Sequence, residues 1–210
     1  MEPVKYLIAI PTTDYMPVQS VASLLHLRRV GASKCTFLQN SLVYDARNML
    51  SAEAIDTGAD RVLWVDSDMV YAPDMMQRLA EDVDSGLDFV CGIFFKRRYP
   101  TVPILSKRVE REGKITLETY TDYPKDQLFE IDACGFGACM MTTKLLKDVW
   151  DNFGSPFYPI NGNGEDYSFC ERAKALGYKL YCDSRIKVGH VGCAIFDESV
   201  YLGGKENEKV

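Results

Sequence analysis

The sequence predicts an α/β protein whose mostly parallel central sheet is flanked by helices, as in Rossmann-like folds. Strand and helix patterns alternate through the first 68 residues, which is the signature of an open parallel sheet. The strands in this part are continuous apolar runs, as expected for a sheet covered on both faces. We expect one domain over residues 1–202 and a flexible polar tail over residues 203–210.

The first three strands and two helices follow one another with short connections. Apolar runs predict strands at residues 4–10, 35–38 and 62–65. Apolar residues at helical spacing predict helices at residues 17–30 and 43–57, each ended by a glycine. Ligands bind beyond the carboxyl ends of strands in such sheets, so the loop after the first strand is expected to contact a ligand. The first helix is expected to bury an apolar face of Val18, Val21, Leu24, Leu25 and Leu27.

Two carboxylates, Asp66 and Asp68, directly follow the third strand. In a continuing strand their Cβ atoms would lie about 7 Å apart, and a turn would bring the carboxylates closer. Like charges at the end of a buried strand repel, which favours a cation between them. Mg²⁺ and Mn²⁺ prefer oxygen ligands of this kind. The alternative is that Asp66 caps a turn and Asp68 points to water.

The middle of the chain departs from simple alternation. A helix at residues 74–84 and a buried strand at 89–95 precede the basic cluster Lys96-Arg97-Arg98. This cluster is either a solvated loop or a surface for phosphates or an acidic acceptor. Two polar strands at residues 104–109 and 114–120 predict a β-hairpin. We interpret the hairpin as an insertion over residues 103–121 that contacts a partner or an acceptor.

Two glycines, Gly135 and Gly137, follow a predicted strand at residues 128–133. They permit close backbone approach or a positive φ. Residues 139–141 then lead into a helix at residues 143–150, and a last strand is expected at residues 178–182.

A second polar stretch, Asn161-Gly162-Asn163-Gly164, precedes Glu165 and Asp166 at the start of a helix. Carboxylates in a first turn commonly offset the helix dipole. The same dipole would keep a carboxylate ionised, as a general base requires. His190 lies among Gly189 and Gly192, which leave its ring little packing of its own. A structural or solvent-facing role is the default for such a histidine.

Composition excludes several classes of function. A net charge of −6 and a pI near 5.0 argue against a general nucleic-acid binder, though not against a nucleotide ligand. No apolar run approaches the roughly 20 residues that span a bilayer, and the first residues do not resemble a signal peptide. The seven cysteines are scattered in apolar segments, which favours buried, reduced thiols and a cytoplasmic protein.

The ordered motifs resemble those of nucleotide-sugar glycosyltransferases with the GT-A fold, in particular compact family-2-like enzymes of bacteria and phages. They are Pro11-Thr12-Thr13, Ala46-Arg47-Asn48, VLWVDSDM, Gly135-Phe136-Gly137, GEDYSFCERAKALGY and Gly189-His190, which together cover most of residues 4–193. The resemblance implies a hexosyltransferase-like enzyme that takes a UDP- or GDP-sugar, a carbohydrate or other hydroxyl acceptor, and Mn²⁺ or Mg²⁺.

The resemblance also implies roles for individual residues. Asp68 would bind the divalent ion, with His190 as a further ligand, and Asp66 would contact the ribose, the ion or both. Asp166 would be the general base on the acceptor hydroxyl, and Glu165 would contact the acceptor. The tryptophan that galactosyltransferases carry before this motif is replaced by Asn161-Gly162-Asn163. The nucleotide-sugar site would include Pro11, Thr12, Thr13, Arg47, Asp66, Ser67 and Gly137.

Three alternatives stay open at this point. A base at Asp166 favours inversion by direct displacement, but retaining enzymes of the same fold also have late-histidine metal sites. A nucleotidyltransferase would also use carboxylates and a divalent ion, although the loop after its first strand is usually rich in glycine and basic residues. A GT-A-like module could bind a carbohydrate or nucleotide without turnover.

Overall fold

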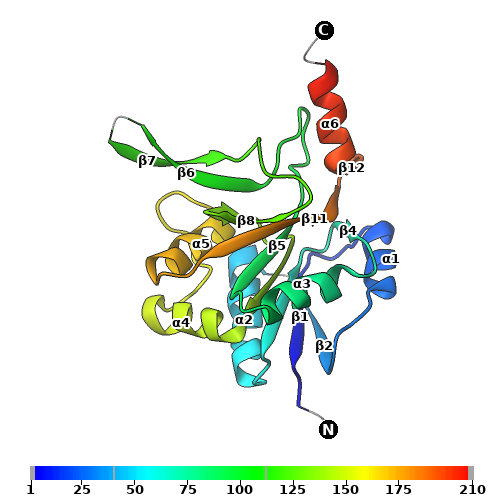
Figure 1. Cartoon of the computed structure of the whole chain (residues 1–210). Coiled ribbons are helices and arrows are strands. Elements are labelled where there is room, and N and C mark those ends of the chain that lie inside the picture. The colour runs from blue at the N-terminus through cyan, green and yellow to red at the C-terminus, as the bar shows by residue number, and fades with distance from the viewer. Residues whose placement is uncertain (1–2, 40, 112, 208–210) are drawn as a thin grey trace.

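One large sheet lies at the centre of the molecule. The computed structural model describes residues 3–39, 41–111 and 113–207 (Figure 1). Within these residues nine strands form the sheet: β1 (Tyr6–Pro11), β2 (Ser33–Leu38), β3 (Arg61–Val65), β4 (Met69–Tyr71), β5 (Phe89–Ile93), β8 (Leu128–Ile131), β10 (Ala138–Thr142), β11 (Leu180–Val191) and β12 (Ile195–Phe196). The main path runs β12-β11-β5-β10-β3-β1-β2, and β4 and β8 join through β11.

The core of this sheet is mostly parallel, as predicted. β1 pairs in parallel with β2 and β3, and β11 pairs in parallel with β5. β10 is the exception, because it runs antiparallel to both β3 and β5. The carboxyl ends of β1, β3, β5 and β11 therefore meet at one edge of the sheet, where the predicted site residues follow them.

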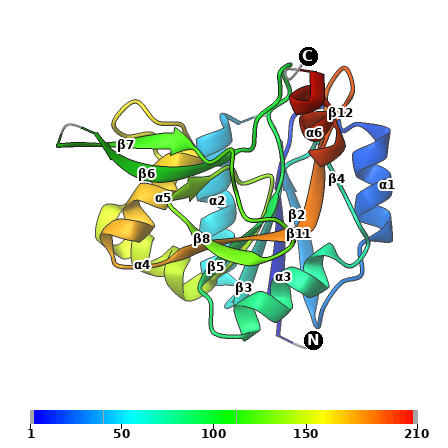
Figure 2. The ribbon, with the colours of Figure 1, turned by 45° about the horizontal axis from the view of Figure 1, so that its top comes forward.

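Helices cover both faces of the sheet (Figures 1 and 2). Successive residues of β1 point to opposite sides, so Leu7 belongs to one hydrophobic cluster and Ile8 to the other. The first cluster includes side chains of α2 (Val43–Asp56), α4 (Thr143–Phe153) and α5 (Glu165–Ala175), and the second includes side chains of α3 (Met75–Asp84). No helix in the described part of the chain is long and apolar enough to cross a membrane. Five of the seven cysteines are buried thiols, as predicted, namely Cys91, Cys134, Cys139, Cys170 and Cys182, whereas Cys35 is half-buried and Cys193 is exposed.

The prediction for the first helix is wrong in part. Helix α1 (Val18–His26) is only nine residues long and packs beside β4. Val18 is 75% exposed and Leu25 is 79% exposed, so they do not belong to a buried face. Leu27 is buried, but it follows the helix with an extended backbone. The apolar residues at helical spacing therefore lie partly on an exposed part of the helix and partly in the loop after it.

The predicted hairpin is present and projects from the body of the molecule (Figures 1 and 2). Its strands are β6 (Leu105–Arg111) and β7 (Lys114–Thr119), and β6 also pairs with the short β9 (Ala133–Cys134). β9 belongs to the region predicted as one strand over residues 128–133, which is divided between β8 and β9 because the two halves pair with different partners.

The last part of the chain is more ordered than the sequence suggests. β11 is twelve residues long and extends well beyond the predicted strand at residues 178–182. Helix α6 (Glu198–Asn207) follows β12 and includes the first residues of the segment expected to be a polar tail. Residues 208–210 lie outside the described part of the chain.

Candidate functional site

Segments from the whole length of the chain meet at the carboxyl edge of the sheet and line a cavity of about 260 Å³. We call it the carboxylate cavity. It is lined by the loop after β1, the start of α2, the turn after β3, the loop after β5, the start of α5 and the end of β11. The predicted site residues that line it are Pro11, Thr12, Thr13, Arg47, Asp66, Ser67, Asp68, Glu165 and His190.

The backbone turns sharply after β3. The amide of Met69 donates a 3.3 Å hydrogen bond to the carbonyl of Asp66, and β4 starts at Met69. The carbonyl of Asp68 accepts a 2.8 Å hydrogen bond from the amide of Val191, which ties the turn to β11. The sequence left open a continued strand or a turn, and the chain forms the turn. Neither carboxylate simply faces water, because each is paired with a cation.

Gly137 packs against this turn and is hydrogen-bonded to it. Its carbonyl accepts a 3.2 Å hydrogen bond from the amide of Asp66. A Cβ at this position would lie 2.8 Å from Cε of Met69 and 3.0 Å from Cε2 of Phe94, so a larger residue would force the side chain of Met69 to move. Gly137 is buried and is not among the residues that line the carboxylate cavity. The structure therefore places it behind the site, whereas the sequence suggested a ligand contact.

Asp68 and His190 face each other across the junction of β4 and β11. Oδ1 of Asp68 lies 3.4 Å from Nε2 of His190, and Oδ2 lies 2.7 Å from Nη1 of Arg97. Burial raises the pKa of Asp68, but the contact with His190 and the charge of Arg97 outweigh it, so the net pKa is lowered. Asp68 is therefore an ionised ligand or ion-pair partner at neutral pH.

The chemistry of this pair fits a divalent cation. Nδ1 of His190 lies 3.0 Å from the carbonyl oxygen of Phe95, which can only accept a proton, so Nδ1 carries the proton. Nε2 then faces Asp68 with a lone pair whenever the ring is neutral, as in metal-binding histidines held by a backbone carbonyl. Within the described residues there is no group of three or more histidine, cysteine or carboxylate side chains arranged to hold a metal. Two protein ligands suffice where substrate phosphates complete the coordination.

Asp66 is paired with Arg47 rather than with His190. Nη2 of Arg47 lies 2.7 Å from Oδ1 of Asp66, and Nε lies 3.4 Å from Oε1 of Glu165. Burial lowers the pKa of Arg47, but the charges of Asp66, Glu165 and Asp166 outweigh it and raise the net pKa. Arg47 thus links the two acidic motifs, which lie about a hundred residues apart in the sequence.

The surroundings of Arg47 are aromatic. Its guanidinium carbon lies 5.7 Å from the ring centre of Trp64, 5.4 Å from that of Phe136 and 5.9 Å from that of Phe157. The side chain is only 2% exposed, yet Nη1 has no hydrogen-bond partner within the described residues. An unpaired donor on a buried cation is costly. Arg47 also lines the carboxylate cavity, so this buried cation lies at the wall of the candidate site.

Glu165 and Asp166 begin α5 but have different surroundings. Glu165 lines the carboxylate cavity, whereas Asp166 does not. Oδ1 of Asp166 accepts a 2.7 Å hydrogen bond from the amide of Tyr167. Burial and the charge of Glu165 nevertheless raise the pKa of Asp166 to about 6. A carboxylate with this pKa is still mostly ionised at pH 7, and the pKa lies near the working pH of a general base.

The sequence reasoning missed several residues of the cavity. Arg97 is the clearest, because the basic cluster was left between a solvated loop and a phosphate-facing one. Nη1 of Arg97 also donates a 3.5 Å hydrogen bond to the carbonyl of Val191, so the side chain lies over the cavity. The available signal was the position of the cluster directly after a buried strand. Ala46 lines the cavity as part of the Ala46-Arg47-Asn48 motif, whereas Ser41 and Val43 line it without any sequence signal that we recognised.

Comparison with known structures supports a GT-A-like fold. The chain is similar to a protein described as A197 from STIV, with 18% identity and a TM-score of 0.62, over 90% of this chain and 86% of that one. It is also similar to GalNAc-T7, solved with UDP, GalNAc and Mn²⁺, with 11% identity and a TM-score of 0.60. That match covers 98% of this chain and 48% of the GalNAc-T7 chain, so this chain spans about half of it.

Sequence comparisons add no closer relative. No family model matches the chain, and no curated protein matches it. The class that the comparisons define is therefore a mixed α/β protein with a GT-A-like fold. What this chain does must be argued from its own cavity.

Proposed function

We propose that the protein is a metal-dependent glycosyltransferase that moves a sugar from a UDP- or GDP-sugar to an acceptor hydroxyl with inversion. The observation that carries this proposal is the meeting of three groups in one cavity: the Asp68–His190 pair, the buried Arg47, and Arg97. A cation-binding pair beside two guanidinium groups matches a nucleoside diphosphate and its metal ion. The GalNAc-T7 structure contains UDP and Mn²⁺, which supports the same class of ligand.

In this proposal different residues of the carboxylate cavity bind different parts of the nucleotide-sugar donor. Asp68 and His190 hold the divalent ion. Arg97, which contacts Asp68 through an exposed ion pair, is available to bind a phosphate oxygen. The loop of Pro11, Thr12 and Thr13 is placed at the cavity wall for the base and ribose. When bound, the metal ion supplies a Lewis acid for the charge that develops on the leaving diphosphate.

The chemical step that we propose is a single displacement. The acceptor oxygen attacks the anomeric carbon and forms the new glycosidic bond. The bond from that carbon to the β-phosphate oxygen breaks, and its electron pair leaves with the nucleoside diphosphate. Asp166 takes the acceptor proton, and its pKa of about 6 keeps most of it ionised at pH 7. Arg47 holds Asp66 and Glu165 in place around the reacting groups.

Nucleotide binding and turnover test the proposal separately. The protein is incubated with Mn²⁺ and a panel of UDP- and GDP-sugars, and release of the nucleoside diphosphate is measured. Calorimetry with UDP or GDP, with and without Mn²⁺, measures binding. We expect metal-dependent binding of at least one nucleotide and slow release of the diphosphate from its sugar. Pyrophosphate as product would show a nucleotidyltransferase, and binding without any product would show a binding module; either result overturns the proposal, as does the absence of binding.

A further inference from the structure

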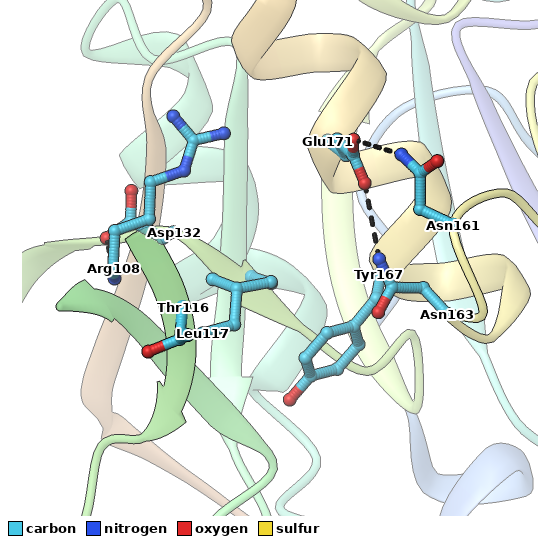
Figure 3. Close-up of a pocket in the computed structure, with 9 residues that line it drawn as sticks. Arg108, Thr116, Leu117, Asp132, Asn161, Asn163, Tyr167 and Glu171 are labelled. Atoms are coloured by element: carbon cyan, nitrogen blue, oxygen red, sulfur yellow. Dashed lines mark hydrogen bonds between the residues drawn. The ribbon is translucent and has the colours of Figure 1, made fainter. Parts of the chain in front are cut away.

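A second cavity of about 570 Å³ separates the hairpin from α5. Figure 3 shows Arg108, Thr116 and Leu117 on one side of this cavity and Asn161, Asn163 and Tyr167 on the other. We call it the hairpin groove. Its volume lies in the range of roughly 300–1,000 Å³ that is typical of small-molecule sites. The resemblance assigned no role to the hairpin that forms one of its walls.

The start of α5 lies between the hairpin groove and the carboxylate cavity. Glu165 lines the carboxylate cavity, and Tyr167 lines the hairpin groove. Asp166, between them in sequence, interacts electrostatically with Arg47 and Asp66 on the first side and with Tyr167 on the second. Oδ1 of Asp166 accepts a 2.7 Å hydrogen bond from the amide of Tyr167, so a ligand that contacts Tyr167 in the hairpin groove would lie close to the proposed base.

The wall formed by residues 161–163 presents side-chain amides, which suit a ligand with neutral polar groups. Nδ2 of Asn161 donates to Oε1 of Glu171 at 2.7 Å, and Nδ2 of Asn163 donates to Oε2 of the same carboxylate at 3.2 Å. One carboxylate thus fixes the orientation of both amides, and Figure 3 shows the two bonds. The amide carbonyl oxygens remain available as acceptors for hydroxyl groups.

The other groups in the hairpin groove favour a saccharide over an anion. Leu117 is 37% exposed, and the ring of Tyr167 is held by a 2.8 Å contact between its hydroxyl group and Oγ of Ser106. These provide apolar surface for the face of a sugar ring. The carboxylates of Asp132 and Glu171 also line the groove, and they are balanced by the guanidinium of Arg108 and by Lys174, which pairs with Asp132. A lining with balanced charges suits an uncharged ligand.

We propose that the hairpin groove binds the acceptor, that the acceptor is an uncharged saccharide, and that the hairpin determines which saccharide is accepted. The role as acceptor site rests on the proposed glycosyltransferase function, whereas saccharide binding in the groove does not. The inference stands on the position of the groove beside Asp166 and on the pair of amides held by Glu171.

Nuclear magnetic resonance of the full-length ¹⁵N-labelled protein tests the proposal. Lactose, cellobiose, maltose and N,N′-diacetylchitobiose are titrated to millimolar concentration in the presence of UDP or GDP and Mg²⁺, which is diamagnetic. We expect at least one disaccharide to shift the side-chain amide signals of Asn161 and Asn163 in a saturable way. If none of the four shifts these signals, or if the shifts occur only around Thr12 and Thr13, the proposal is overturned.

Variants then locate the binding site. Asn161 has a φ of +54°, which glycine adopts without strain, so Asn161→Gly removes the amide and keeps the backbone. Thr116→Ala removes an exposed hydroxyl of the hairpin, and Thr119→Ala, on the same strand but outside the groove, is the matched control. We expect the first two to weaken saccharide binding at least fivefold and the control to leave it unchanged. Equal affinities for all three variants would overturn the proposal.

The nucleotide titration separates this inference from the proposed function. Asn161→Gly and Thr116→Ala are expected to bind UDP or GDP as the wild type does, because neither residue lines the carboxylate cavity. A protein that binds a disaccharide in the hairpin groove but binds no nucleotide would contradict the proposed function and leave saccharide binding standing. A protein that binds nucleotide but no disaccharide would overturn this inference and leave the proposed function standing.

Discussion

Nη2 of Arg47 lies 2.7 Å from Oδ1 of Asp66, and this ion pair joins α2 to the turn after β3 inside the molecule. The same guanidinium contacts Glu165 and is surrounded by three aromatic rings. Asp66 is therefore fixed by a cation of the protein itself, while Asp68, two residues on, is paired with the exposed Arg97 and with His190. The two aspartates of one motif consequently have different roles in the structure.

Replacing Arg47 is expected to destabilise the protein strongly. Arg47→Met keeps much of the packing but leaves Asp66 and Glu165 without their cation, and removal of one partner from a buried ion pair costs about 3–5 kcal/mol. Arg47→Lys is expected to cost less, because it retains the charge and loses only the two-pronged contact. Urea unfolding measures both. Equal stability of wild type and Arg47→Met would show that the buried pair contributes nothing.

Asp68→Asn is expected to abolish the metal dependence of nucleotide binding. The amide has no charge for the cation, and the ion pair with Arg97 is lost at the same time. Asp74→Asn, which removes a carboxylate from an exposed ion pair on α3, is the control. Calorimetry with UDP or GDP, with and without Mn²⁺, gives the result. A metal effect of unchanged size in Asp68→Asn would show that the cation binds elsewhere.

Arg97→Gln is expected to change metal and nucleotide binding in opposite directions. Arg97 shares Asp68 with the proposed ion, so its removal frees a carboxylate oxygen. An exposed pair of this kind contributes at most about 1 kcal/mol, so the affinity for Mn²⁺ alone is expected to rise by up to about fivefold. The affinity for a nucleoside diphosphate is expected to fall, because one cation near the phosphates is gone. A fall in both affinities would mean that Arg97 does not compete with the metal.

The rate of sugar transfer is expected to depend on the ionisation of Asp166. Its pKa is about 6, and only the ionised form accepts the proton of the acceptor. The rate should therefore be nearly constant above pH 7 and fall about tenfold per pH unit below 6. Asp166→Asn should lower the rate by roughly 10²–10⁴ without loss of nucleotide binding. Wild-type turnover in this variant would remove Asp166 from the mechanism.

Stability should respond to the same group with the opposite trend. The pKa of Asp166 is raised on folding from 3.8 to about 6, so the folded protein favours the protonated form. Its contribution to stability is fully present below pH 3.8 and is lost as the pH rises through 6. Asp166→Asn should therefore be more stable than wild type at pH 7, by on the order of 1–2 kcal/mol, and this advantage should disappear below pH 4. Urea unfolding at both pH values measures the difference.

Local patterns in the sequence were enough to predict the outline of the fold. Continuous apolar runs identified β1, β3 and β5, and the polar hairpin was recognised from its two strands. β10 was missed because an antiparallel strand buried among parallel ones has the same apolar composition as the start of a helix. The exposed face of α1 was missed because spacing reports which residues share a face and not whether anything covers it.

The candidate site was predicted only as far as residue types and order allow. Asp66, Asp68, Glu165, Arg47 and His190 line one cavity, whereas Asp166 is not part of its lining. Which cation pairs with which carboxylate depends on distances that arise after folding, so the pairing of Arg47 with both Asp66 and Glu165 was not foreseen. The raised pKa of Asp166 depends on burial by distant segments, and the hairpin groove depends on the angle at which the hairpin leaves the sheet.

The length of β11 has a consequence for the order in which the protein matures. This strand pairs with β5, β8, β4 and β12. Its last two residues are His190 and Val191, and the amide of Val191 donates a hydrogen bond to the carbonyl of Asp68. Most residues of the cavity wall are synthesised before residue 170, but His190, which faces Asp68, is added some twenty residues later. A chain synthesised only as far as residue 189 thus lacks His190, and the cation-binding pair is completed only after β11 has been made.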